Sequence, residues 1–347
     1  MEAASSTSSF IATSNRGFSL YAQDEIRRLF PGAKCTELSR DEVFLVRLPI
    51  AREAAIARMT GLQEPIFVRH LQPVDFERNN IQSGEQADDT MQDALEALPR
   101  FRHGAKLALQ LRKQEGLELS AELSELRQTA ADRLNARDGI VSVARDSDLI
   151  LSMFWTADSL YAGVSAPEHN LSDWSGGAIR FQREENQISR AKFKLLEAEQ
   201  EFELHFEAYE FALDIGAAPG GWTSLLLERG MRVTAVDPGE MHPSLLHNPQ
   251  LTILRKNAGD VSFPAGAFDL LVCDMSWSPR QMAKLLMPLL DSLRTGGTAI
   301  VTLKLMHGKP FQTVKDTSRE FAAQLELVRA KQLFHNRDEV TLFLLKR

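Results

Sequence analysis

The chain has 347 residues and a formal net charge of −7, with 44% hydrophobic and 25% charged residues. This length predicts two or three domains whose cores need no disulfides, and the composition excludes a disordered or fibrous protein. Because the net charge is negative, bulk charge gives no support to nucleic-acid binding. Any such surface must be a local cluster of Lys and Arg.

The two cysteines, Cys35 and Cys273, are too few for a disulfide framework, and neither stands in a cluster that could hold zinc. We therefore expect a cytoplasmic protein without a metal site. The N-terminal residues lack the positive start and apolar stretch of a signal peptide, and no apolar run is long enough to span a membrane. We expect a monomer that has no membrane partner.

The first part of the chain predicts a small α+β unit over residues 1–76. Its expected elements are a strand at 9–14, a helix at 19–30, a strand at 43–49, a helix at 51–59 and a strand at 66–74. The polar residues 75–89 show no apolar periodicity, so they are expected to be a linker.

A second α+β unit is expected over residues 77–170. Its predicted elements are helices at 90–98 and 119–137 and strands at 106–113, 140–144, 148–155 and 159–166. Residues 171–188 carry turn formers and charges of both signs, and we interpret them as a connecting segment.

From residue 189 to 347 the pattern becomes a regular alternation of strands and helices. Short, nearly continuous apolar strands are expected at 211–216, 231–237, 251–257, 268–274 and 298–305, with a helix extending through Arg294 before the last of them. Such strands are typical of a parallel sheet covered by helices on both faces. The fold class is therefore α/β, with a C-terminal doubly wound, Rossmann-like sheet.

The most informative stretch is the glycine-rich turn from Asp214 to Thr223, between a predicted strand and a helix. Glycines at the carboxyl end of such a strand let the backbone approach a ligand closely. Pro219 interrupts the dinucleotide pattern G-x-G-x-x-G, so a nucleoside-containing cofactor fits better than a pyrophosphate. The alternative is a turn whose glycines serve packing alone.

The motif D-x-G-x-x-P-G-G-W resembles the S-adenosylmethionine site of class I methyltransferases, in particular the FtsJ-like ribose 2′-O-methyltransferases. Asp237 ends the next strand, where a carboxylate can accept hydrogen bonds from ribose hydroxyls. Asn257 follows the third strand, at the family position for the adenine amino group. Asp is common there, so Asp260 is the alternative. The resemblance implies these cofactor-binding residues: Asp214, Gly216, Ala217, Pro219, Gly220, Gly221, Trp222, Asp237, Asn257 and Asp274.

Four further residues match the order and local context of the Lys-Asp-Lys-Glu tetrad of FtsJ-like enzymes: Lys194, Asp274, Lys304 and Glu339. Lys192 is a rival for Lys194, because two residues on a helix are about 200° apart and only one can face the site. The family pattern S-R-x-x-x-K-L selects Lys194. Lys304 is the candidate general base, which must be neutral for part of the time. Desolvation and a nearby Lys194 cation would favour that form, while Asp274 and Glu339 orient Lys304 and oppose the shift.

The resemblance extends to the RlmM-type methyltransferases, which modify a cytidine of 23S ribosomal RNA. It is carried by SRAKFKLLEA, LDIGAAPGGWT, VCDM, LKL and QLFHNRDEVTLFL. The two upstream units are similar to that family's ferredoxin-like and THUMP regions by order and size. Candidate phosphate contacts there are Arg100, Arg102, Arg112 and Lys113. Trp155, Trp174 and Trp277 are candidates for stacking on a base.

The expected function is therefore S-adenosylmethionine-dependent ribose 2′-O-methylation of 23S ribosomal RNA or its precursor. No metal is expected, because the methyl donor carries its own leaving group. One alternative is a 2′-O-methyltransferase of transfer RNA or another RNA. The other is a non-catalytic protein that binds RNA and the cofactor.

Overall fold

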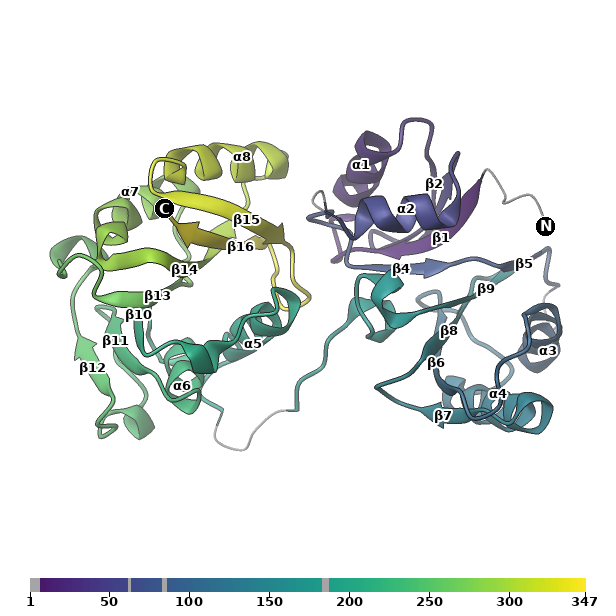
Figure 1. Cartoon of the computed structure of the whole chain (residues 1–347). Helices are drawn as coiled ribbons and strands as arrows, with labels where there is room; N and C mark the ends of the chain where they lie inside the picture. Colours follow the sequence, from purple (N-terminus) through teal and green to yellow (C-terminus); the bar gives the residue numbers. More distant parts are fainter. Residues whose placement is uncertain (1–6, 62–63, 83–85, 183–186) are drawn as a thin grey trace. The chain divides into compact units, whose positions relative to one another are not determined.

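The computed structural model describes residues 7–61, 64–82, 86–182 and 187–347. The chain divides into two compact units, Met1–Ala178 and Ile179–Arg347 (Figure 1). Residues 183–186 of the expected connecting segment lie outside the described residues.

The N-terminal unit begins with a four-stranded antiparallel sheet in the order β2-β3-β1-β4. Its elements are β1 (Ser8–Thr13), α1 (Ser19–Leu29), β2 (Lys34–Ser39), β3 (Val43–Leu48), α2 (Arg52–Met59) and β4 (His70–Pro73). The central strand β1 has a neighbour on each side, and Ile11 is buried against Phe154 and Tyr161. Helix α1 ends just before Pro31 and Gly32, two residues that do not continue a helix.

A second, five-stranded sheet in the same unit has the order β5-β9-β8-β6-β7. Its elements are β5 (Phe76–Asn79), α3 (Ala87–Ala97), β6 (Lys106–Lys113), α4 (Leu123–Asp138), β7 (Val141–Val143), β8 (Leu149–Trp155) and β9 (Ser159–Ser165). Alternate leucines of β6, including Leu107 and Leu109, share one core with the apolar faces of α3 and α4. Helix α4 ends at Gly139, whose φ of +70° suits glycine.

Two segments differ from the sequence-based expectation. Residues 76–79, expected in a linker, form β5 and pair with β9, since an edge strand needs no apolar alternation when its polar side chains face solvent. Residues 171–178, expected in the connecting segment, pack within the N-terminal unit. There Gly176 O accepts hydrogen bonds from Thr13 Oγ1 at 2.9 Å and Arg69 Nε at 3.0 Å.

The C-terminal unit contains a seven-stranded sheet in the order β12-β11-β10-β13-β14-β16-β15. The neighbouring strands from β12 to β14 are parallel, and β16 runs antiparallel to both β14 and β15. The α/β fold with a parallel sheet expected from the strand pattern is confirmed. Helices α5 and α6 lie on one face of the sheet and α7 and α8 on the other (Figure 1).

The bounds of the C-terminal elements follow the chain. They are α5 (Lys192–Glu201), η3 (Phe206–Ala208), β10 (Phe211–Ile215), α6 (Gly221–Glu228), β11 (Arg232–Val236), η4 (Pro243–Leu245), β12 (Leu251–Leu254), η5 (Ala258–Asp260), β13 (Phe268–Cys273), α7 (Pro279–Leu286), η6 (Met287–Ser292), β14 (Leu293–Lys304), α8 (Pro310–Phe321), β15 (Leu325–Lys331) and β16 (Glu339–Lys346).

The helix expected through Arg294 is shorter than predicted. Its last turn ends at Ser292, and Leu293 already pairs with Phe268 as the start of β14. Gly296 and Gly297 follow, and glycine disfavours helix. Within the described ranges, no helix is both long and apolar enough to cross a bilayer.

Candidate active site

Five polar or glycine positions meet at one edge of the C-terminal sheet. Gly216, Asp237 and Asp274 directly follow the parallel strands β10, β11 and β13, and Lys304 is the last residue of β14. Since β16 runs antiparallel to β14, its first residue, Glu339, lies opposite Lys304 at the same edge. The carboxyl edge of such a sheet is the usual ligand-binding edge.

The turn after β10 requires its glycines. Gly216 and Gly220 have φ angles of +80° and +110°. A Cβ at Gly216 would lie 2.6 Å from Met275 Cγ, and one at Gly220 would meet Leu245 Cδ1. These glycines are therefore needed by the turn itself, whether or not a ligand is bound. Gly216 is half-buried and Gly220 is buried.

Asp214 lies beneath this turn rather than on its surface. Its side chain is fully buried, and Asp214 Oδ2 accepts a hydrogen bond from Thr223 Oγ1 at 2.6 Å. Burial raises the pKa of Asp214 to about 7. The hydrogen bond from Thr223 lowers this pKa, whereas the negative charges of Asp274 and Asp237 raise it further. The carboxyl group thus titrates near neutral pH.

The remaining cofactor candidates are placed differently. Trp222 is buried in the core, and its Nε1 donates to Ala191 O at 2.7 Å, so its indole ties the start of α5 to α6. Ala217 is also buried, whereas Pro219 is exposed. Any contact of Trp222 with a ligand must come from its backbone.

Polar groups follow the next two strands. Asp237 is half-buried, and its Oδ1 accepts a hydrogen bond from Gly239 N at 2.7 Å. Asn257 and Asp260 are both exposed after β12, and Asn257 Nδ2 donates to Asp260 Oδ2 at 3.0 Å. The two alternatives for the adenine contact therefore form one hydrogen-bonded pair.

Lys194 connects two carboxylates. Its Nζ lies 3.0 Å from Asp274 Oδ1 and 2.7 Å from Glu339 Oε2. Asp274 Oδ1 also accepts a hydrogen bond from Thr302 Oγ1 at 2.7 Å. Burial alone would lower the pKa of Lys194, but Asp274 and Glu339 outweigh it and hold that pKa above its ordinary value. Lys194 is therefore a fixed cation.

Lys304 differs from Lys194 although it lies opposite Glu339 in the sheet. Its side chain is exposed, and no described residue lies within hydrogen-bond or ion-pair distance of its Nζ. The expected desolvation of Lys304 is therefore not supplied by the described protein residues. A bound substrate would have to supply it.

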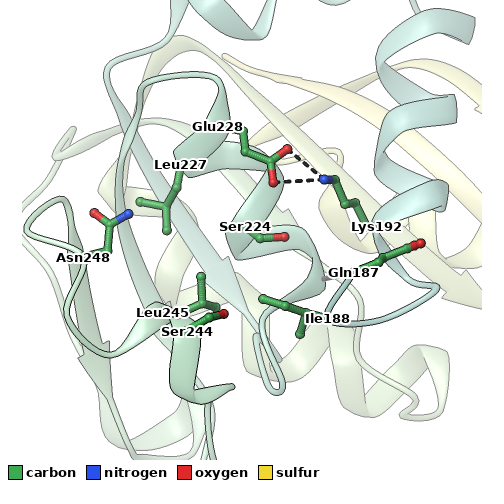
Figure 2. Close-up of a pocket in the computed structure, with 9 residues that line it drawn as sticks. All are labelled: Gln187, Ile188, Lys192, Ser224, Leu227, Glu228, Ser244, Leu245 and Asn248. Carbon is green, nitrogen blue, oxygen red and sulfur yellow. Dashed lines mark hydrogen bonds and ion pairs between the residues drawn. The ribbon is translucent and has the colours of Figure 1, made fainter. Parts of the chain in front are cut away.

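Lys192, the rival of Lys194, lies on a different face of α5. Its buried Nζ is 2.8 Å from Glu228 Oε2 on α6, at one side of a cavity of about 330 Å³ (Figure 2). Other walls of this cavity come from Gln187 and Ile188 and from Ser244, Leu245 and Asn248. Lys194, Asp274, Lys304 and Glu339 do not line it.

Sequence reasoning missed Thr302 and Thr223, the two hydroxyls that orient Asp274 and Asp214. A signal for Thr302 was present, because residues two apart on a strand share a face and Thr302 precedes Lys304 by two. The signal for Thr223 was weaker, since a threonine in the first turn of a helix commonly bonds to backbone.

The nucleic-acid candidates outside this edge are mostly engaged in the fold. Arg100 Nη1 pairs with Asp138 Oδ1 at 2.9 Å, and Arg112 Nη2 donates to Gln72 Oε1 at 3.1 Å. Trp155 is buried, and its Nε1 donates to Thr90 Oγ1. Trp277, which follows Asp274 by three residues, is 50% exposed.

The edge described above has groups that suit a nucleoside cofactor. It offers a glycine turn, a half-buried carboxylate after the next strand and a polar pair after the one beyond it. Within the described ranges no group of three His, Cys, Asp or Glu side chains could hold a metal ion. Fold and site together define a class I methyltransferase-type domain.

The comparison with known families concerns the C-terminal unit. Residues 187–332 match the family model described as FtsJ-like methyltransferase, so this part of the chain is similar to the FtsJ-like methyltransferases.

Curated relatives extend this likeness. A Ribosomal RNA large subunit methyltransferase M from Halorhodospira halophila is 35% identical over 186 residues, 53% of each protein. One from Shewanella woodyi is 27% identical over 307 residues, 83% of each. Several of the most similar relatives are matched over only about half their length. Among solved structures, TrmN from Thermus thermophilus is 16% identical, with 98% of this chain and 100% of that chain covered and a TM-score of 0.42.

Proposed function

We propose that this chain is an S-adenosylmethionine-dependent RNA ribose 2′-O-methyltransferase. The observation that carries the proposal is the different state of two lysines at one sheet edge. Lys194 is held as a cation by Asp274 and Glu339, and Lys304 lies opposite Glu339 without a partner among the described residues. The FtsJ-like family match supports the same chemistry.

The cofactor would be held by the backbone of the turn from Gly216 to Gly221 and by the polar groups after β11 and β12. Asp237 is suited to the ribose hydroxyls, and the pair of Asn257 and Asp260 to the adenine edge. When bound, S-adenosylmethionine supplies a methyl group on a positively charged sulfur whose bond to that methyl group is ready to break.

The protein's own task is to prepare the acceptor oxygen. A ribose 2′-hydroxyl is a weak nucleophile at neutral pH, so a base must take its proton as the oxygen attacks the methyl carbon. Neutral Lys304 Nζ would accept that proton. The Lys194 cation would stabilise negative charge on the oxygen, while Asp274 and Glu339 hold Lys194 in place.

The proposed substrate is large-subunit ribosomal RNA, with a cytidine as the target. The names of the curated relatives support the ribosomal assignment, and the longer alignment extends into the N-terminal unit. The strand, helix, strand, strand, helix, strand order of β1 to β4 supports a ferredoxin-like unit. We assign RNA binding to this unit and to the THUMP-like unit of β5 to β9. Exposed Trp277 offers a ring on which the unpaired target base can stack.

The proposal is tested by transfer of labelled methyl groups from S-adenosylmethionine to total RNA of a strain that lacks the gene. The RNA is then fractionated, and 2′-O-methyl sites are mapped. Label at one 23S nucleotide is expected. Label confined to transfer RNA would overturn the ribosomal assignment, and absence of label from both RNA and pre-ribosomal particles would overturn the enzymatic one.

A further inference from the structure

The turn that precedes β16 is tied to helix α5 by one buried carboxylate. Glu197 Oε1 accepts a hydrogen bond from Phe334 N at 2.6 Å, and its Oε2 accepts one from His335 N at 2.9 Å. His335 Nδ1 lies 2.6 Å from the same Oε2. Because a carboxylate only accepts, the hydrogen of this third bond lies on the His335 ring.

Both ends of this connection lead to the tetrad. Glu197 follows Lys194 by three residues on α5, and His335 precedes Glu339 by four residues in the chain. Helix α5 is therefore joined to the segment around the start of β16 at two points. One is the Glu197 carboxylate, which binds residues 334 and 335, and the other is the ion pair between Lys194 and Glu339. Holding residues 334 and 335 on α5 limits where Glu339 can lie.

Other contacts make the turn rigid. Asn336 Oδ1 accepts hydrogen bonds from Leu333 N at 2.8 Å and Thr341 Oγ1 at 3.1 Å. The His335 ring stacks on Phe181 and packs against Phe193, with centroids 5.5 Å and 5.3 Å apart. A shift at Glu197 would therefore move a rigid piece of chain rather than a single side chain.

We infer that Glu197 is a positioning residue that holds Glu339 against Lys194 during methyl transfer. Its effect is indirect, since it meets the turn and not the lysine. The expected effect of Glu197 on methyl transfer rests on the proposed function. The expected effect of Glu197 on the position of Glu339 rests on the geometry alone.

The negative charge of Glu197 suits it to this role. The carboxyl group is buried and takes three donors, and hydrogen bonds to a charged acceptor are stronger than neutral ones. Glu197→Gln keeps the shape but replaces one acceptor oxygen with an NH₂ group, which would face a backbone N–H. At least one bond to the turn is then lost.

Glu199→Gln is a matched control. Glu199 lies on the same helix and pairs at 2.7 Å with Arg229, the residue that follows α6. Its side chain makes no hydrogen bond or ion pair with the described residues of the turn. Both variants remove one carboxylate charge from α5. Only Glu197→Gln removes a bond between α5 and residues 334–335.

The first measurement is hydrogen exchange of the whole chain. Glu197→Gln is expected to raise the exchange rate of the 334–339 amides about tenfold or more, as loss of roughly one bond to a charged group implies. Glu199→Gln should leave these amides at the wild-type rate. Equal exchange in wild type and Glu197→Gln would overturn the inference, whatever the enzyme's activity.

The second measurement is single-turnover methyl transfer in a double-mutant cycle with Glu339→Gln. Glu197→Gln should lower the rate about tenfold while changing cofactor Kd less than about twofold. If Glu197 acts through Glu339, adding Glu197→Gln to Glu339→Gln should cost nothing further. Rate losses of the two single variants that multiply in the double variant would overturn the inference.

If Glu197→Gln does not fold, His335→Phe replaces it in both measurements, because it keeps the aromatic stacking and loses one hydrogen bond to Glu197. A wild type that transfers no methyl group would count against the proposed function and leave the exchange result to decide on Glu197.

Discussion

Lys194 Nζ lies 2.7 Å from Glu339 Oε2, although one residue is on α5 and the other begins β16. Together with Asp274, this contact holds the pKa of Lys194 above its ordinary value. Two lysines at one edge are thereby in unequal environments. Lys194 lies between two carboxylates, whereas no described residue lies within hydrogen-bond or ion-pair distance of Lys304 Nζ.

Replacing Lys304 with arginine separates charge from basicity. A guanidinium keeps the positive charge but does not lose its proton in proteins. We expect Lys304→Arg and Lys304→Ala both to lower methyl transfer by at least about a hundredfold, the usual contribution of a general base. Cofactor affinity measured by calorimetry should stay within about twofold of wild type. Substantial turnover by Lys304→Arg would show that Lys304 supplies charge and not a base.

Lys192 and Lys194 make a paired test on one helix. Lys194→Met removes the cation from between Asp274 and Glu339 and should abolish turnover. Lys192→Met removes the ion pair with half-exposed Glu228, so a loss of about 1 kcal/mol of stability and nearly wild-type turnover are expected. Thermal unfolding and single-turnover rates distinguish them. The reverse pattern would show that Lys192 is the lysine of the site.

The glycine turn is tested by adding a single methyl group. Gly216→Ala places a Cβ 2.6 Å from Met275 Cγ at a φ of +80°, so the turn must shift. Cofactor affinity should fall about tenfold or more. Gly230→Ala is the control, because its φ is +87° but no described atom lies within 4 Å of the added Cβ. Equal affinities of the two variants would place the cofactor elsewhere.

Asp214 predicts a pH dependence of stability. Its pKa is about 7 in the folded protein against an ordinary value of 3.8, so between these values the folded state binds the extra proton. The contribution of Asp214 to the free energy of unfolding therefore falls as the pH rises from 3.8 to about 7, by roughly 4 kcal/mol in total. Asp214→Asn cannot titrate. Its stability relative to wild type should rise from pH 4 to pH 7, as followed by thermal unfolding. A constant difference would contradict the buried, protonated state of Asp214.

The C-terminal sheet could be predicted from sequence because its strands are buried on both faces. Continuous apolar runs such as that of β13 indicate such strands. The residues that directly follow these runs are then expected at the carboxyl edge of the sheet, where ligands usually bind. Peripheral elements carry less signal. β5 is a polar edge strand, and its pairing with β9 depends on backbone groups that have no sequence pattern.

The contacts within the site were less predictable than its members. Helical rotation shows that Lys192 and Lys194 face different ways, but not which of them meets Asp274. The unequal environments of Lys194 and Lys304 arise from the pairing of β14 with β16 and from the packing of α5. Such long-range contacts are invisible to local periodicity. The Glu197 bonds to residues 334 and 335 are of the same kind.

The most direct test of the central claim uses an RNA fragment that contains the mapped target nucleotide. Methyl transfer is measured to this fragment and to the same fragment with a single 2′-deoxy substitution at that nucleotide. Methyl transfer to the ribose form and none to the deoxy form is expected, because the deoxy form lacks the acceptor oxygen. Equal transfer to both would place the methyl group on the base and contradict the assignment of Lys304 as the base for a 2′-hydroxyl.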